Sequence, residues 1–177
     1  MTANQKSRTV ARLGLLFALA CAFSFIESLI PTSFFLPPGV KLGLSNLVTM
    51  FSAVFLGIPS AVMITVLKSG FVLLTRGAVA GLMSAGGGVF SLLVMAFFIQ
   101  NKKARFTLRF ISICGAVGHN IGQLIISSLL LASLTTFAYA PVLLLSGIFM
   151  GYLTSVLFFA LLPPLKNITV FSDLKSR

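Results

Sequence analysis

The feature that most constrains this chain is a series of long apolar segments separated only by short basic clusters. A helix needs about 20 mostly apolar residues to cross a bilayer, and several segments reach or approach that length. Hydrophobic residues make up 58% of the 177 residues and charged residues only 8%, whereas soluble domains carry about 25% charged residues. The chain is therefore predicted to be an integral membrane protein.

Glycine, proline and charge clusters divide the apolar sequence into an expected all-α bundle of six transmembrane helices, forming one membrane domain over residues 1–177. The expected helices cover about residues 11–30, 42–57, 59–75, 78–99, 109–134 and 138–163. The second and third are short and are separated only by Gly57-Ile58-Pro59. This pair is either a tight hairpin or one bent element.

Lysine and arginine predict the orientation, because cytoplasmic loops retain these residues. With the N-terminus inside, ten of the 13 basic residues fall on inner segments, Lys41 and Arg76 fall outside, and Lys68 lies within the third helix. Both termini are then cytoplasmic in a multi-pass protein of the cell membrane. The net charge of +11 is explained by this orientation, so no nucleic-acid partner is expected.

Acidic residues are almost absent, since Glu27 and Asp173 are the only two. Mechanisms that need paired carboxylates or an acidic metal cage are therefore excluded. The glycine run 86–88 is not followed by the Gly-Lys-Ser/Thr of a phosphate-binding loop, and it is expected to mark a helix break or a close approach of backbones. We expect a protein that is not an enzyme and that needs no metal or cofactor.

Polar groups inside the apolar segments are the candidate binding residues. An ionisable side chain at the bilayer centre costs about 2.5–3.5 kcal/mol and persists where it is paired or useful. Counting about 1.5 Å per residue along each helix places these groups in the outer half of the membrane, around one expected pocket. The candidates are Glu27, Lys41, Asn46, Lys68, Arg76, His119, Asn120 and Gln123.

Two observations favour a ligand at these positions. His119 and Gln123 are four residues apart and share a helix face, with glycines beside them that allow a close approach. Glu27 is the one carboxylate within an expected span, so it neutralises one cation, and the remaining positive charge needs water or an anionic guest. The alternatives are hydrogen bonds between helices and, for Lys41 and Arg76, extension of the side chain to the outer interface.

Two segments are expected to make further contacts. The loop after the first helix is apolar and stiffened by prolines, and it forms either a lid over the pocket or an interfacial anchor; it contains Phe34, Phe35, Pro37 and Pro38. Small residues four apart mark faces where helices approach closely in lipid. On the first helix these are Gly14, Ala18 and Ala22, which pack within the bundle or dock another membrane subunit.

Two stretches resemble the membrane family named heptaprenyl diphosphate synthase component I, also called Gx transporter proteins. They are Lys41-Leu42-Gly43-Leu44-Ser45-Asn46-Leu47, preceded by Pro37-Pro38, and Gly118-His119-Asn120-Ile121-Gly122-Gln123-Leu124. The resemblance covers nearly the whole chain. That family is similar to the S components of energy-coupling factor transporters, which are six-helix substrate-binding subunits with an outward-facing pocket.

The resemblance to S components implies a binder of a small anionic, partly apolar metabolite, such as a vitamin-like compound or a quinone or isoprenoid precursor. It implies a transmembrane coupling subunit, contacted by the row Gly14, Ala18 and Ala22, and two separate ATPase subunits. It also implies that the loop after the first helix caps the substrate and that the bundle topples in the membrane to deliver it.

The family name implies another function. Prenyl diphosphate synthases bind Mg-diphosphate through two Asp-rich clusters, whereas this chain has the single aspartate Asp173. The alternative is therefore a non-catalytic membrane accessory subunit of a heptaprenyl diphosphate synthase, with the basic segment Lys102–Arg109 contacting the enzyme. A channel or secondary carrier is a third interpretation, but no inverted repeat is evident between the halves.

Overall fold

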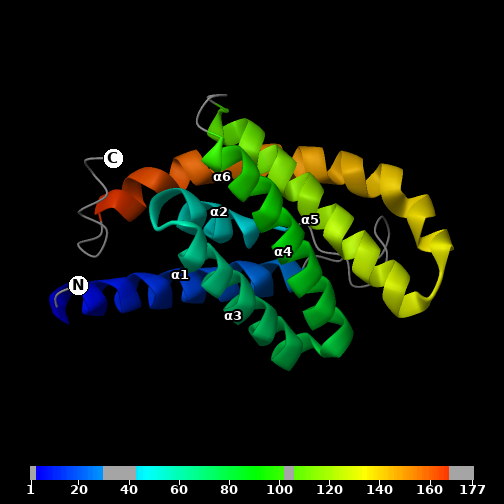
Figure 1. Ribbon diagram of the computed structural model, residues 1–177, viewed down its shortest axis with the longest axis horizontal. Helices are drawn as coiled ribbons and strands as arrows, with labels where there is room; N and C mark the ends of the chain where they lie inside the picture. Colours follow the sequence, from blue (N-terminus) through cyan, green and yellow to red (C-terminus); the bar gives the residue numbers. More distant parts are fainter. Residues whose placement is uncertain (1–2, 30–42, 102–105, 168–177) are drawn as a thin grey trace.

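The computed structural model describes residues 3–29, 43–101 and 106–167, and the described chain is helical (Figure 1). The elements are α1 (Ala3–Leu29), α2 (Asn46–Phe55), α3 (Ile58–Arg76), α4 (Ala78–Gln100), α5 (Leu108–Leu131), the 3-10 helix η1 (Leu134–Tyr139) and α6 (Ala140–Asn167). The expected all-α fold is confirmed. The start of α1 and the end of α6 lie on the same side of the bundle (Figure 1).

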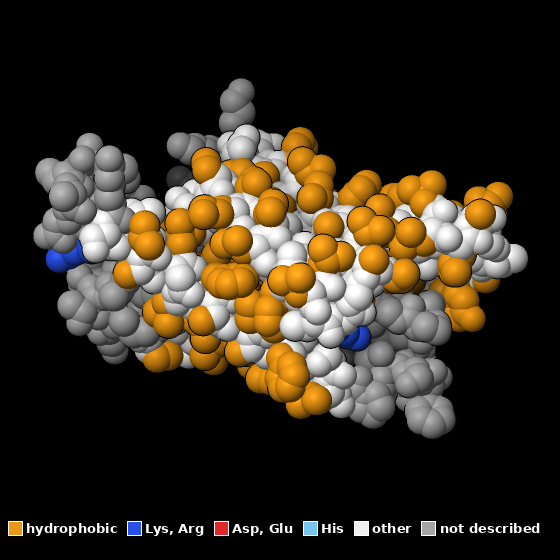
Figure 2. Space-filling model, turned by 90° about the horizontal axis from the view of Figure 1, so that it is seen from below, with side chains coloured by type: hydrophobic (Ala, Val, Ile, Leu, Met, Phe, Trp, Pro, Cys, Tyr) orange, Lys and Arg blue, Asp and Glu red, His pale blue; other side chains and the backbone are white. Residues whose placement is uncertain are grey.

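Within the described residues, five segments are long and apolar enough to cross a membrane. They are Ser7–Leu29, Ile58–Arg76, Ala78–Gln100, Leu108–Leu131 and Leu134–Pro164. Hydrophobic side chains spread over the face seen in Figure 2, as expected of a surface that contacts lipid tails. The chain is a multi-pass membrane protein.

The second expected helix is shorter than predicted. α2 has ten residues, or about 15 Å, which is half the thickness of the hydrocarbon core. It lies between Gly43 and Gly57, whose φ angles of 87° and 93° fall in the left-handed region that favours glycine. α2 and α3 are separate helices joined through Leu56 and Gly57, so the pair is not one bent element.

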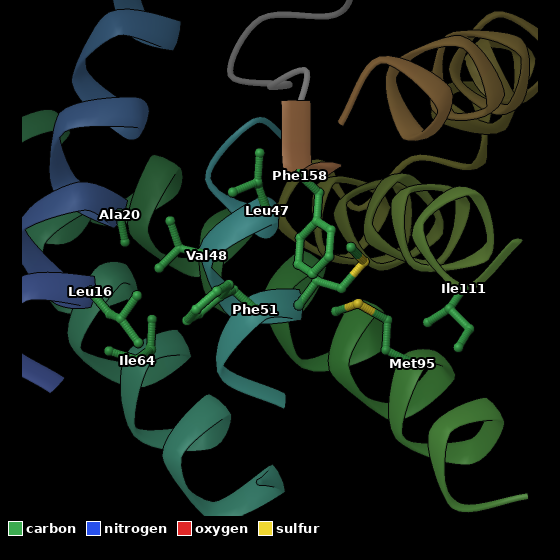
Figure 3. Packing of buried hydrophobic residues seen from close by; sticks show 10 residues of the cluster. Leu16, Ala20, Leu47, Val48, Phe51, Ile64, Met95, Ile111 and Phe158 are labelled. Atoms are coloured by element: carbon green, nitrogen blue, oxygen red, sulfur yellow. The ribbon is translucent and has the colours of Figure 1, made fainter. Parts of the chain in front are cut away.

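α2 lies inside the bundle and forms its core. Eight of its ten residues are buried, and it contacts α1, α3, α4, α5 and α6. Phe51 packs between Leu16 and Ile64 on one side and Phe158 on the other (Figure 3), and the Phe51 and Phe158 ring centroids are 6.2 Å apart. A helix buried on all sides holds the surrounding long helices at fixed distances.

α4 and α5 approach closely through glycines. A Cβ atom at Gly122 would lie 2.6 Å from the carbonyl oxygen of Gly86, and one at Gly118 would lie 2.9 Å from Cγ2 of Val94. Larger residues cannot be accommodated without separating the two backbones. α4 continues through the glycine run 86–88, so this run permits a close approach, and the alternative of a helix break is wrong.

Candidate functional site

The structure brings together five of the expected site residues from four helices. They form the polar cluster, defined as Glu27 of α1, Asn46 of α2, Lys68 of α3, and His119 and Gln123 of α5. All five side chains are at most 5% exposed. Each is a polar group removed from water, so it needs compensation from polar or charged neighbours.

Lys68 donates a hydrogen bond to an amide, and its charge is also compensated electrostatically by a carboxylate. Its Nζ atom donates a hydrogen bond of 3.1 Å to Oδ1 of Asn46, and the charge of Glu27 interacts with it across the cluster. Lys68 is only 1% exposed. A buried ammonium group without compensation would be strongly destabilising, and the charge of Glu27 supplies part of this compensation.

Glu27 has a second role that the sequence did not suggest. Its Oε1 atom accepts hydrogen bonds from the backbone N–H groups of Gly43 and Leu44, the latter at 3.4 Å. The carboxylate therefore connects the end of α1 to the turn that begins α2. A negative charge at this position is also favourable next to the N-terminus of a helix.

His119 and Gln123 lie against the glycine run of α4. A Cβ atom at Gly87 would be 2.6 Å from Cε1 of His119 and 2.9 Å from Cγ of Gln123. On the other side, a Cβ atom at Gly43 would be 3.4 Å from Cδ2 of His119. The imidazole thus lies between Gly87, where a Cβ atom would be too close, and Gly43, where the φ angle of 87° favours glycine.

Asn120 lies away from the polar cluster. Its Nδ2 atom donates to the carbonyl oxygen of Leu143 at 2.7 Å and to Oγ of Ser146 at 3.3 Å, both in α6. One residue of helix corresponds to a rotation of about 100°, which turns Asn120 from the face of His119 towards α6. Asn120 therefore joins α5 to α6. This matches the alternative interpretation, in which a polar side chain makes hydrogen bonds between helices and does not bind a ligand.

The remaining expected site residues are not in the cluster. Arg76 is exposed at the end of α3, eight residues beyond Lys68 and so about 12 Å from it along the axis, in agreement with the alternative of an interfacial side chain. Lys41 and the expected lid residues Phe34, Phe35, Pro37 and Pro38 lie outside the described residues.

A cavity, called the outer cavity below, lies one helical turn from the polar cluster. Its volume is about 450 Å³, and it is lined by Val79, Met83, Ser127, Leu130, Leu131, Thr135, Thr136 and Tyr139. Ser127 follows Gln123 by one turn of α5, and Met83 precedes Gly87 by one turn of α4. The volume is within the usual range for small-molecule sites, about 300–1,000 Å³.

The lining of this outer cavity is apolar with a few hydroxyl groups. Ser127 and Thr136 are 7% and 5% exposed, and Thr135 and Tyr139 contribute two further hydroxyls. Sequence reasoning missed these residues. The available signal was the spacing of four between Gln123 and Ser127, which places both on one face of α5.

Charge is balanced among the described members of the cluster. Glu27 supplies one negative charge and Lys68 one positive charge, while Arg76 lies at the surface. The surplus of cations that predicted an anionic guest therefore depends on Lys41, which is outside the described residues. Among the described residues, no group of three histidine, cysteine or acidic side chains could hold a metal ion.

The row of small residues on α1 faces outwards. Gly14, Ala18 and Ala22 are all exposed, and a Cβ atom at Gly14 would meet nothing within 4 Å. The row therefore does not pack within the described bundle, and it leaves a smooth face on α1 that another helix can approach.

This arrangement defines a multi-pass membrane bundle with a buried polar cluster beneath a cavity, and a solved structure shares the fold. That solved structure is described as "Structure and mechanism of the S component of a bacterial ECF transporter". It is similar with a TM-score of 0.71 and 22% sequence identity, covering 92% of this chain and 97% of that chain.

The sequence identifies the family. The family described as heptaprenyl diphosphate synthase component I matches residues 16–161, and the chain belongs to it. A comparison with curated proteins found no match. The family predicted from the two sequence stretches is confirmed, and so is the fold predicted from its similarity to S components.

Proposed function

We propose that this chain is the substrate-binding membrane subunit, or S component, of an energy-coupling factor type uptake transporter. The observation that carries the proposal is the outer cavity of about 450 Å³ one turn from a cluster of five buried polar side chains. The fold shared with an S component supports it. Such a subunit captures its substrate and catalyses no reaction.

The proposed substrate is a small, partly apolar anion, such as a vitamin-like compound or a quinone or isoprenoid precursor. Leucine, valine and methionine side chains of the outer cavity suit its apolar body, and the hydroxyls of Ser127 and Thr136 suit a polar substituent. The negative group would approach Lys68, His119 and Gln123, with Asn46 orienting it. Lys41 would add the positive charge that the Glu27–Lys68 pair does not supply.

The proposed partners are a transmembrane coupling subunit and two ATPase subunits. The exposed row of Gly14, Ala18 and Ala22 supports docking of a helix on α1, because small residues allow backbones to approach closely in lipid. The proposed location is the bacterial plasma membrane with both termini in the cytoplasm. The start of α1 and the end of α6 lie on the same side of the bundle, which supports placing both termini on one side of the membrane (Figure 1).

The test is mass spectrometry of small molecules retained by the purified protein, followed by an uptake assay with the molecule identified. Lys68→Ala and His119→Ala are expected to reduce retention and uptake at least about tenfold, the effect of about 1.4 kcal/mol of lost binding. Thr75→Ala is the control, since its hydroxyl is exposed and bonds to Phe71 of its own helix. Unchanged uptake in both variants that still fold would contradict the proposed roles.

The family name favours one other function, a non-catalytic accessory subunit of a heptaprenyl diphosphate synthase. In this case the basic segment Lys102–Arg109 would contact the soluble enzyme, and Arg109 is exposed. Co-purification from the native membrane separates the two functions. Recovery of coupling and ATPase subunits supports the transporter, whereas recovery of a prenyl synthase supports the accessory subunit.

A further inference from the structure

A second, much smaller cavity lies in the centre of the bundle. Helices α2, α4, α5 and α6 contribute to its lining, and the polar side chains in it are Asn46, Ser91, Ser112 and Thr154. The volume of this cavity is about 10 Å³. A cavity needs about 10–15 Å³ of such volume to hold one water molecule.

Two polar atoms in this lining need a hydrogen-bond partner. Among the described residues, Nδ2 of Asn46 and Oγ of Ser91 have none. Asn46 is 5% exposed and Ser91 is not exposed at all, so bulk water cannot satisfy them. Buried polar groups are almost always hydrogen-bonded to protein or to an ordered water.

The hydrogen bond to Lys68 determines what the occupant must be. An ammonium group has only donors, so the amide of Asn46 must direct Oδ1 to Lys68 and leave Nδ2 as a donor on its other side. The occupant must therefore accept a hydrogen bond from Asn46. A metal cation cannot do so, and a polyatomic anion is too large for about 10 Å³.

Ser112 provides the complementary partner. Its hydroxyl donates its one hydrogen to the carbonyl oxygen of Gly151 at 2.8 Å, so the remaining lone pairs of Oγ can only accept. The lining thus offers a donor in Asn46, an acceptor in Ser112, and a hydroxyl in Ser91 that can do either. This set matches a molecule that is both donor and acceptor.

We propose that a single structural water molecule occupies this cavity and bonds to Asn46, Ser91 and Ser112. It connects α2, α4 and α5 at the centre of the bundle, and it fixes the amide of Asn46 with Oδ1 towards Lys68. Ser91 is then a positioning residue for Asn46 through the water. The inference does not depend on the transport function.

The direct test is a crystal structure grown in a lipid mesophase at a resolution that shows ordered water. We expect one density peak within hydrogen-bonding distance of Asn46 Nδ2 and Ser91 Oγ. A second crystal soaked in bromide distinguishes water from a halide site, because bromide scatters anomalously. Absence of density in the cavity, or an anomalous peak there, would overturn the proposal.

A matched pair of variants tests whether Ser91 contributes to stability through the water. Ser91→Ala removes one of the three hydrogen-bond partners of the water. We expect it to lower Tm by roughly 3–10 °C, because the hydrogen bond between the water and Asn46 Nδ2 is weakened. Ser155→Ala is the control, since Ser155 is equally buried but its hydroxyl bonds to Tyr152 of its own helix at 2.7 Å. Equal decreases of Tm in the two variants would overturn the role of Ser91.

Discussion

Glu27 offers the sharpest test of how the polar cluster is held together, because its two functions can be separated by substitution. The carboxylate accepts from the backbone of Gly43 and Leu44 and compensates the charge of Lys68. Glu27→Ala removes both functions. Glu27→Gln keeps one oxygen acceptor in a side chain of nearly the same shape, but it removes the charge and replaces the other oxygen with an NH2 group.

The expected decreases of Tm follow from the free-energy cost of losing each of these two functions. Leaving a buried N–H group unsatisfied costs about 1–3 kcal/mol, and removing one partner of a buried ion pair costs about 3–5 kcal/mol. For a chain of this size, 1 kcal/mol corresponds to about 2–4 °C in Tm. Glu27→Ala, which loses both contributions, is therefore expected to lower Tm by roughly 8–32 °C, and Glu27→Gln by about 2–12 °C less than Glu27→Ala.

Thermal unfolding of the purified protein in one detergent measures these differences. Lys68→Met, combined with Glu27→Ala, isolates the charge term, because the double variant contains neither charge and should be more stable than Glu27→Ala alone. Identical Tm values for Glu27→Ala and Glu27→Gln would show that the backbone hydrogen bonds contribute nothing. A wild-type Tm for Glu27→Ala would refute the reasoning about both functions.

Three further predictions concern packing, docking and the outer cavity. Gly122→Ala should lower Tm by several degrees, because its Cβ would lie 2.6 Å from the Gly86 carbonyl oxygen; Gly14→Ala, whose Cβ meets nothing within 4 Å, is the control and should not. Ala18→Leu should leave Tm unchanged but reduce co-purification of a coupling subunit, and full recovery of the complex would contradict docking on α1. Ser127→Leu should fill part of the outer cavity and lower retention of the bound small molecule without a loss of Tm; unchanged retention would place the substrate elsewhere.

The lengths of apolar segments predicted most of the fold, and α2 shows the limit of this signal. Five long helices follow from runs of apolar residues, since a spanning helix must satisfy its backbone internally. α2 is shorter than its apolar run because the turn at Gly43 delays its start and the cap at Leu56 ends it. Hydrophobicity cannot distinguish a half-length helix covered by protein from a spanning helix in contact with lipid.

The candidate site was predictable where the residues are costly to bury. Lys68 and His119 stand out because ionisable side chains are rare within membranes, and the structure brings both into the cluster. Ser127 and Thr136 gave little signal, since hydroxyl groups are common in membrane helices and often bond within their own helix, as those of Thr65 and Ser69 do. The contact of Glu27 with backbone N–H groups was not predictable, because any residue at positions 43 and 44 except proline supplies the same donor.

The short length of α2 also changes the electrostatics of the membrane interior. A helix that spans the bilayer places its partial charges at the two aqueous surfaces, whereas the first residue of α2, Asn46, is itself buried in the cluster. The amino end of a helix carries about half an elementary positive charge. Formal charges at Glu27 and Lys68 cancel, so the backbone dipole of α2 leaves this region net positive before any further side chain is counted.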